Sequence, residues 1–225
     1  MNLRVQDASR TTLAGKPPTQ PIRVTASVTF PEKTALRREL RARRKAVTAA
    51  QRQRADRLLA RYARRWLKPA RKVAVYVAVG SEAPTDALIK LALRRGCHVY
   101  VPQVPRHGRQ LRFARVDADT RWRLGRHAIP EPTVHPKQPL LHPRRLDLAF
   151  VPLLGFDASL TRMGQGGGYY DASFSFRRYT VRPRLLGLAF ACQQVDGLPV
   201  EPWDLRVDAL ITEHGVLRPR RLAAP

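Results

Sequence analysis

The sequence predicts a single α/β domain with a mostly parallel sheet flanked by helices. Short apolar runs rich in β-branched residues alternate with helical segments and turns, which is the order that parallel βαβ units require. The length of 225 residues suits one domain, and 44% hydrophobic residues can fill a sizeable core. We place this domain at residues 33–214, between a flexible extension at 1–32 and a short basic tail at 215–225.

The first ordered elements should be two helices. Leu36 and Leu40 fall on one helical face, so a helix is expected to begin near residue 33. The segment Thr-Ala-Ala-Gln at 48–51 has the form of a capping box, which starts a second helix. The apolar stripe of this second helix spans residues 55–66 and is expected to pack in the core.

The hydrophobic period then changes to that of buried strands. A helix from Asp86 to Arg95, capped by Thr85 and ended by Gly96, is expected between the first two strands. A proline-rich connection at 128–143 precedes the fourth strand. The expected strands, in chain order, are 72–79, 97–102, 111–116, 146–152, 185–190 and 208–212.

The net charge of +25 predicts attraction to polyanions such as nucleic acid. The basic residues are spread along the chain, however, with no RNA-binding aromatic motif and no zinc-finger spacing, so any nucleic-acid binding should be non-specific. No apolar run is long enough for a membrane helix. Cys97 and Cys192 make no disulfide framework, which favours a cytoplasmic location, although the acid-poor start also resembles an organelle transit peptide.

The stretch RMGQGGGYYD at 162–171 is the strongest local motif. It follows a predicted strand, and open α/β sheets bind ligands at the carboxyl ends of their strands. Successive glycines let backbone N–H groups converge on an anion, and a helix starting at Tyr169 would add partial positive charge. Arg162 can pair with phosphate, and Asp171 can hold magnesium. Neither a Walker A loop nor a dinucleotide fingerprint fits, and a glycine-rich structural turn is the alternative.

Together these motifs resemble the 5-formyltetrahydrofolate cyclo-ligase family, also called 5,10-methenyltetrahydrofolate synthetases. The resemblance covers residues 33–214. Its segments, in the expected order, are KTALRREL (33–40), VGSEAPT (79–85), IPEP (129–132), LDLAFVPLLGFD (146–157), RMGQGGGYYD (162–171), LGLAFACQQV (186–195) and LPVEPWDLRVDALITE (198–213).

The resemblance implies a Rossmann-like fold of the phosphosugar-isomerase and CoA-transferase type. It also implies an ATP- and Mg²⁺-dependent ligase of one-carbon metabolism that acts on 5-formyltetrahydrofolate, with or without a polyglutamate tail. ATP would phosphorylate the formyl oxygen, N10 would close the ring, and ADP and phosphate would leave with 5,10-methenyltetrahydrofolate as product. The competing hypotheses are a nucleic-acid-binding protein on a related scaffold and a phosphosugar isomerase that works without ATP.

The same resemblance implies roles for individual residues. Arg162 and Tyr169 are the candidate catalytic residues, and Asp171 and Asp204 are the candidate magnesium ligands. The implied ATP-binding residues are Lys33, Arg37, Arg162, Gly164, Gly166, Gly167, Gly168, Tyr169 and Tyr170. The implied folate-binding residues are Glu82, His127, Gly166, Gly167, Gly168 and Tyr169. Many relatives carry a lysine where this chain has Gly167, so one phosphate-binding cation is absent from the loop.

Overall fold

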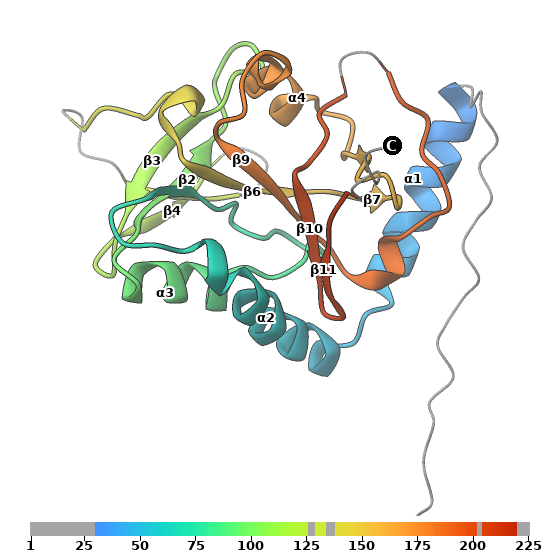
Figure 1. Cartoon of the computed structure of the whole chain (residues 1–225), viewed down its shortest axis with the longest axis horizontal. Coiled ribbons are helices and arrows are strands. Elements are labelled where there is room, and N and C mark those ends of the chain that lie inside the picture. The colour runs from blue at the N-terminus through green and yellow to red at the C-terminus, as the bar shows by residue number, and fades with distance from the viewer. Residues whose placement is uncertain (1–29, 126–128, 134–137, 202–203, 220–225) are drawn as a thin grey trace, which may run out of the picture.

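The computed structural model describes residues 30–125, 129–133, 138–201 and 204–219. The strands of its main sheet are β1 (Lys72–Ala74), β2 (His98–Gln103), β3 (Arg112–Val116), β6 (Leu148–Pro152), β9 (Arg184–Leu188), β10 (Ala209–Thr212) and β11 (Gly215–Leu217). They lie in the order β11-β10-β9-β6-β1-β2-β3 (Figure 1). All central pairs are parallel and the two edge strands are antiparallel, which confirms the predicted fold class.

Helices cover both faces of this sheet. Helices α2 (Ala49–Ala63) and α3 (Asp86–Arg94) lie on one face, and the short α4 (Tyr169–Ser173) lies on the other (Figure 1). Alternate strand residues divide between the two cores, so Val73 packs with the α2 and α3 side chains and Ala74 packs with the aromatic cluster around Phe174. None of the described helices is long and apolar enough to cross a membrane.

Helix α1 (Phe30–Lys45) begins earlier than expected and does not pack on the sheet itself. Its buried residues Leu36 and Leu40 meet Leu154, Met163 and two residues of the 195–198 segment in a separate small cluster. The apolar face predicted from the sequence is therefore correct. Its partner is the loop region after β6, which places the start of α1 beside the glycine motif.

The helix starts show one confirmed and one wrong prediction. The Thr48–Gln51 capping box is present with both hydrogen bonds, so α2 begins as predicted. Thr85 stands at the start of α3, but its hydroxyl donates to the Tyr76 carbonyl at 2.8 Å and caps no helix N–H group. The Asp56 carboxylate of α2 accepts from the Ala87 N–H group instead, at 3.1 and 3.2 Å.

Several strand boundaries also differ from prediction. The strand expected at 72–79 ends at Ala74. The Val75 N–H group still donates to the Tyr100 carbonyl of β2 at 2.9 Å, and the Tyr76 carbonyl then accepts from the Thr85 side chain in place of a neighbouring strand. Residues 215–217, expected in the basic tail, form the edge strand β11. Two small ladders were not predicted: β4 (Trp122–Leu124) pairs with β5 (Pro130–Pro132), and β7 (Gly155–Phe156) pairs with β8 (Arg162–Met163).

Candidate active site

The glycine motif begins on the β7–β8 hairpin and ends at α4. Gly166 has φ +108° and Gly168 has φ +68°, so an L side chain at either position would be strained. Gly168 is the residue that starts α4, and α4 is only five residues long. The helix-dipole contribution expected for this loop is therefore small, and the glycines act mainly by shaping the backbone.

The other two glycines leave room for functional side chains. A Cβ atom at Gly164 would lie 3.3 Å from Nη1 of Arg162. A Cβ atom at Gly167 would lie 3.0 Å from the Tyr169 ring, which is closer than ordinary contact. These glycines therefore let the Arg162 guanidinium and the Tyr169 ring pack directly against the loop.

Arg162 and Asp171 form an ion pair across the loop. The Arg162 side chain is 3% exposed, and its Nη2 donates to Oδ1 of Asp171 at 2.5 Å. The same Oδ1 accepts from the Leu205 N–H group at 3.1 Å. Burial lowers the pKa of Arg162, and the negative charges of Asp171 and Asp204 oppose this effect. Nε of Arg162 is buried without a hydrogen-bond partner among the described residues.

A cleft of about 520 Å³ opens beside this pair. The predicted residues that line it are Lys33, Arg37, Arg162, Gly164, Gly166, Gly168, Asp171 and Asp204. The cleft thus brings together three parts of the chain that are far apart in sequence: two cations of α1, the glycine loop, and residues 199, 201 and 204. Gly167, Tyr169, Tyr170 and Glu82 are not part of the described wall of this cleft.

Glu201 and Asp204 are bonded to each other, and Glu201 is also bonded to α1. Lys33 forms an ion pair with Glu201, and the Asp204 carboxylate accepts from the Glu201 N–H group at 2.8 Å through Oδ2. Arg37, one turn after Lys33, has a buried Nε with no hydrogen-bond partner among the described residues. A buried unpaired guanidinium N–H group is costly, so an anionic ligand would stabilise this wall.

Glu82 lies near Gln165 and Tyr170 of the glycine motif and does not line the cleft. Its Oε2 accepts from the Val79 N–H group at 3.0 Å. Burial raises the pKa of Glu82, while the Val79 N–H group, Arg44 and Gln165 oppose the rise. Burial also raises the pKa of Tyr170, and the charge of Glu82 adds to this increase. The structure therefore brings Glu82 to the motif, as the sequence resemblance implied.

Arg44 is a buried cation that the sequence predictions missed. It is 4% exposed, and its Nε donates to the Ser81 hydroxyl at 3.0 Å. With the Gln165 amide oxygen turned toward it, both terminal nitrogens of Arg44 donate to that oxygen at 2.8 and 3.2 Å. Arg44 follows Leu36 and Leu40 on the apolar face of α1, and a lone arginine on that face was the available signal.

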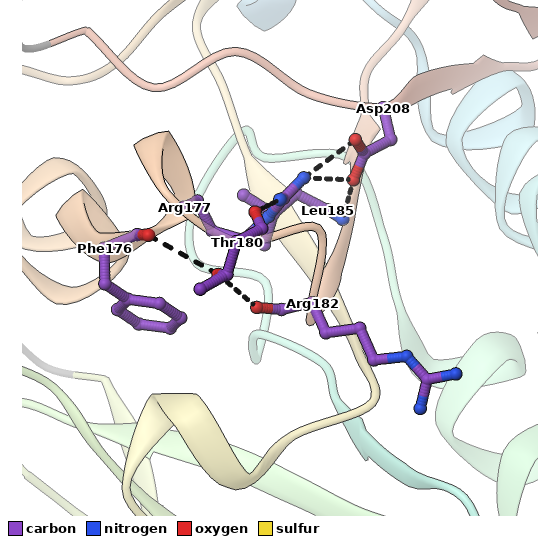
Figure 2. A network of polar contacts seen from close by, with 6 residues as sticks. All are labelled: Phe176, Arg177, Thr180, Arg182, Leu185 and Asp208. Atoms are coloured by element: carbon purple, nitrogen blue, oxygen red, sulfur yellow. Dashed lines mark hydrogen bonds and ion pairs between the residues drawn. The ribbon is translucent and has the colours of Figure 1, made fainter.

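Polar contacts fix the rim of the cleft near Ser175 and Arg178, which belong to the helical turn η4 (Ser175–Arg178). Figure 2 shows the Arg177 side chain pointing toward Asp208, which accepts from it at 2.8 and 2.9 Å. The same carboxylate accepts from the Leu185 N–H group at 2.7 Å. This network ties η4 to β9 and to the start of β10.

One predicted residue cannot be placed, and three charged residues of the cleft were not predicted. His127 lies outside the described residues. Within the described ranges, no group of three or more His, Cys, Asp or Glu side chains could hold a metal ion. Arg109, Arg178 and Glu201 line the cleft but were not among the predicted residues, and nothing in their local sequence distinguishes them from other charged surface residues.

Comparisons with known proteins agree with this geometry. A model of the 5-formyltetrahydrofolate cyclo-ligase family matches residues 29–213. The 5-formyltetrahydrofolate cyclo-ligase of Haemophilus influenzae is 33% identical over 174 residues, covering 76% of this chain and 91% of that protein. The Mus musculus protein of the same name is 28% identical over 193 residues, covering 80% and 93%. The solved structure of Aquifex aeolicus 5,10-methenyltetrahydrofolate synthetase superposes with a TM-score of 0.67 at 27% identity, covering 86% of this chain and 95% of that one.

Proposed function

Because this chain belongs to the 5-formyltetrahydrofolate cyclo-ligase family, we propose that its cleft converts 5-formyltetrahydrofolate to 5,10-methenyltetrahydrofolate. ATP is the co-substrate, and ADP and phosphate are the other products. The chain is thus an ATP-dependent ligase of folate one-carbon metabolism. The nucleic-acid hypothesis explains the net charge of +25 but not the cleft, so nucleic acid is at most a non-specific partner.

The observation that carries the proposal is a pair of guanidinium groups, each with a buried Nε that has no hydrogen-bond partner among the described residues. Arg37 and Arg162 both line the cleft, and Nε of each is buried without a partner among the described residues. Backbone donors of the glycine loop lie beside them, at positions whose conformation excludes side chains. Oxyanions of a triphosphate satisfy such donors, and arginine forms its strongest hydrogen bonds with them. We assign ATP to this cleft, with Lys33, Arg37, Arg162 and the segment 164–170 as its contacts.

The reaction then proceeds in two steps, each of which forms one bond and breaks another. The formyl oxygen of the substrate attacks the γ-phosphorus of ATP, the bond to ADP breaks, and the formyl carbon becomes an activated electrophile. N10 attacks that carbon and loses its proton, the carbon–oxygen bond breaks, and phosphate leaves. Arg162 would neutralise charge on the transferring phosphoryl group, because such reactions depend on positioning and electrostatic stabilisation. Tyr169, whose ring packs against the glycine loop at Gly167, is the second proposed catalytic residue.

A magnesium ion fits the carboxylates present. Asp171 and Asp204 both line the cleft, and the hydrogen bonds described for them use only Oδ1 of Asp171 and Oδ2 of Asp204. Magnesium commonly takes one or two carboxylates and completes its shell with phosphate oxygens and water. We therefore propose these two side chains as its ligands. The ion would neutralise phosphate charge.

The folate ring is assigned to the opposite side of the glycine motif, at Glu82. A carboxylate can accept hydrogen bonds from the 2-amino and N3 groups of a pterin ring. Its half-buried position and the Gln165 amide beside it fix the direction of that carboxylate. Gly166, Gly167, Gly168 and Tyr169 would lie between the two ligands, and His127 is a further proposed contact. Cys97 and Cys192 are both free, in keeping with the cytoplasmic location that we propose.

The test is formation of the methenyl product, followed by its absorbance, with ATP and Mg²⁺ supplied together or separately. Product that requires both would support the proposal, and a folded protein that forms none would refute it. Asp204→Asn should raise the Mg²⁺ concentration needed for half-maximal rate, because one ligand loses its charge. Asp196→Asn is the matched control, since Asp196 is exposed and does not line the cleft. An unchanged Mg²⁺ requirement in Asp204→Asn would remove Asp204 from the metal site.

A further inference from the structure

The segment that precedes β3 is fastened to α4. The Ser173 hydroxyl accepts from the Leu111 N–H group at 2.7 Å and donates to the Tyr169 carbonyl at 2.6 Å. The Arg109 carbonyl lies 3.4 Å from the same hydroxyl. One buried serine thus holds the backbone around Arg109 in a fixed position relative to the end of the glycine loop.

The Arg109 side chain extends over that loop. A Cβ atom placed on Gly168 would lie 3.6 Å from Nη1 and 3.8 Å from Cδ of Arg109, and among the described residues, apart from the chain neighbours of Gly168, no other atom comes within 4 Å. Arg109 also lines the cleft. The absence of a side chain at Gly168 therefore lets the Arg109 guanidinium rest on the loop backbone, at the position that starts α4.

Charge pairing distinguishes Arg109 from Arg162 and Lys33, two other cations of the cleft wall. Within the stretch 162–171 the single basic residue is Arg162, and that guanidinium is buried and paired with Asp171. Lys33 is paired with Glu201. No carboxylate is paired with Arg109 among the described contacts. The charge of the loop's own arginine is thus already balanced by Asp171, and Arg109 brings an additional positive charge to the cleft from outside the loop.

We propose that Arg109 is a phosphate-binding residue of the ATP site, donating from the β2–β3 connection to the phosphate chain held by the glycine loop. This inference rests on the proposed function, because it takes ATP as the ligand of the cleft. Arginine donates in a planar fork that matches phosphate oxygens, and its fixed backbone reduces the entropy lost on binding. Arg109 therefore acts on ATP affinity and leaves the folate side of the site unaffected.

The test compares Arg109→Ala with Arg112→Ala in the full-length protein. Arg112 is a matched control because it is exposed, carries the same charge and does not line the cleft. Loss of one charge-assisted contact should raise KM for ATP, and Kd for a non-hydrolysable ATP analogue measured by calorimetry, about tenfold. KM for 5-formyltetrahydrofolate and the unfolding temperature should stay at wild-type values, and Arg112→Ala should match wild type throughout.

A second-site variant separates a charge effect from a structural one. Gly167 has no positive φ, so Gly167→Lys can place a cation on the same loop after a small shift of the Tyr169 ring. In the Arg109→Ala background this lysine should recover most of the lost ATP affinity. Wild-type affinity for the ATP analogue in Arg109→Ala would overturn the inference, as would a rise confined to the folate KM. If wild-type protein binds the analogue but forms no methenyl product, the proposed reaction is refuted. The effect of Arg109→Ala on the Kd measured by calorimetry then still decides whether Arg109 binds ATP.

Discussion

Asp157 connects the glycine hairpin to the 198–204 segment, and its replacement tests whether that connection builds the site. The carboxylate is buried in the turn between β7 and β8. Its Oδ1 accepts from the N–H groups of Ser159 at 2.9 Å and Thr161 at 3.1 Å, and its Oδ2 accepts from Leu198 at 3.0 Å. Leu198 leads directly into the cleft residues Pro199 and Glu201.

The structure sets the expected loss of stability. Asp157→Ala leaves the buried N–H groups of Thr161 and Leu198 without acceptors, whereas Ser159 is exposed and can bond to water. An unsatisfied buried donor costs about 1–3 kcal/mol, so Asp157→Ala should lower the free energy of unfolding by about 4 kcal/mol. Asp157→Asn keeps one acceptor oxygen for the turn but sets its NH₂ group against the Leu198 donor, so about 2 kcal/mol should be lost.

Urea unfolding monitored by circular dichroism measures both variants, and steady-state kinetics on Asp157→Asn measures the site. Because the lost bond is the one to Leu198, we expect KM for ATP to rise more than KM for 5-formyltetrahydrofolate. Asp196→Asn controls for removal of an exposed carboxylate from the same region. Asp157→Ala with a stability within about 0.5 kcal/mol of wild type would refute the reasoning, since surface changes have effects of that size.

Two further predictions concern Glu82 and Asp56. Burial raises the pKa of Glu82 from 4.5, so the folded protein holds this proton more tightly than the unfolded chain, and stability falls as pH rises above about 4.5. The stability of Glu82→Gln relative to wild type should therefore increase as pH rises from 4 to 8. The same variant should have a higher KM for the folate. A stability difference that does not vary with pH would contradict the pH prediction. Asp56→Ala should lower stability by about 1 kcal/mol, because its carboxylate caps α3 at Ala87, and a thermal unfolding midpoint lower by about 2–4 °C would show it. Thr85→Ser keeps the hydroxyl bond to the Tyr76 carbonyl and should change the midpoint less than Asp56→Ala; the reverse order would contradict the capping role assigned to Asp56.

The elements that could be predicted from sequence are those whose signals are local. The capping box at Thr48 needs only four residues, and the 3.6-residue period of α2 and α3 reports directly on the face that is buried. The central strands β6 and β9 are buried on both faces, so their continuous apolar runs identify them. The glycine motif was recognisable for a similar reason, since its conformation excludes side chains whatever lies around it.

The remaining features depend on contacts between distant segments. β11 consists of half-buried residues whose pairing with β10 decides their structure, so its sequence resembles a tail. Residues Pro130–Pro132 carry two prolines, which normally argue against a strand and are tolerated here at the edge of a two-stranded ladder. The sequence prediction of the α3 cap was wrong for the same reason. The capping carboxylate, Asp56, belongs to another helix, and the hydroxyl of Thr85 donates to the Tyr76 carbonyl instead.

Arg44 shows how much of such a long-range arrangement a sequence can reveal. Leu36, Leu40 and Arg44 recur at four-residue spacing, so the arginine must point into the same interior as the leucines. A buried guanidinium costs several kcal/mol unless its donors are satisfied, so its position alone predicts polar partners inside that core. The partners, Ser81 and the Gln165 amide, belong to the two segments beside the proposed folate-binding residue Glu82. They can be identified only from the three-dimensional structure. Because the Arg44 guanidinium bonds to both segments, the packing of α1 stabilises their positions at the site.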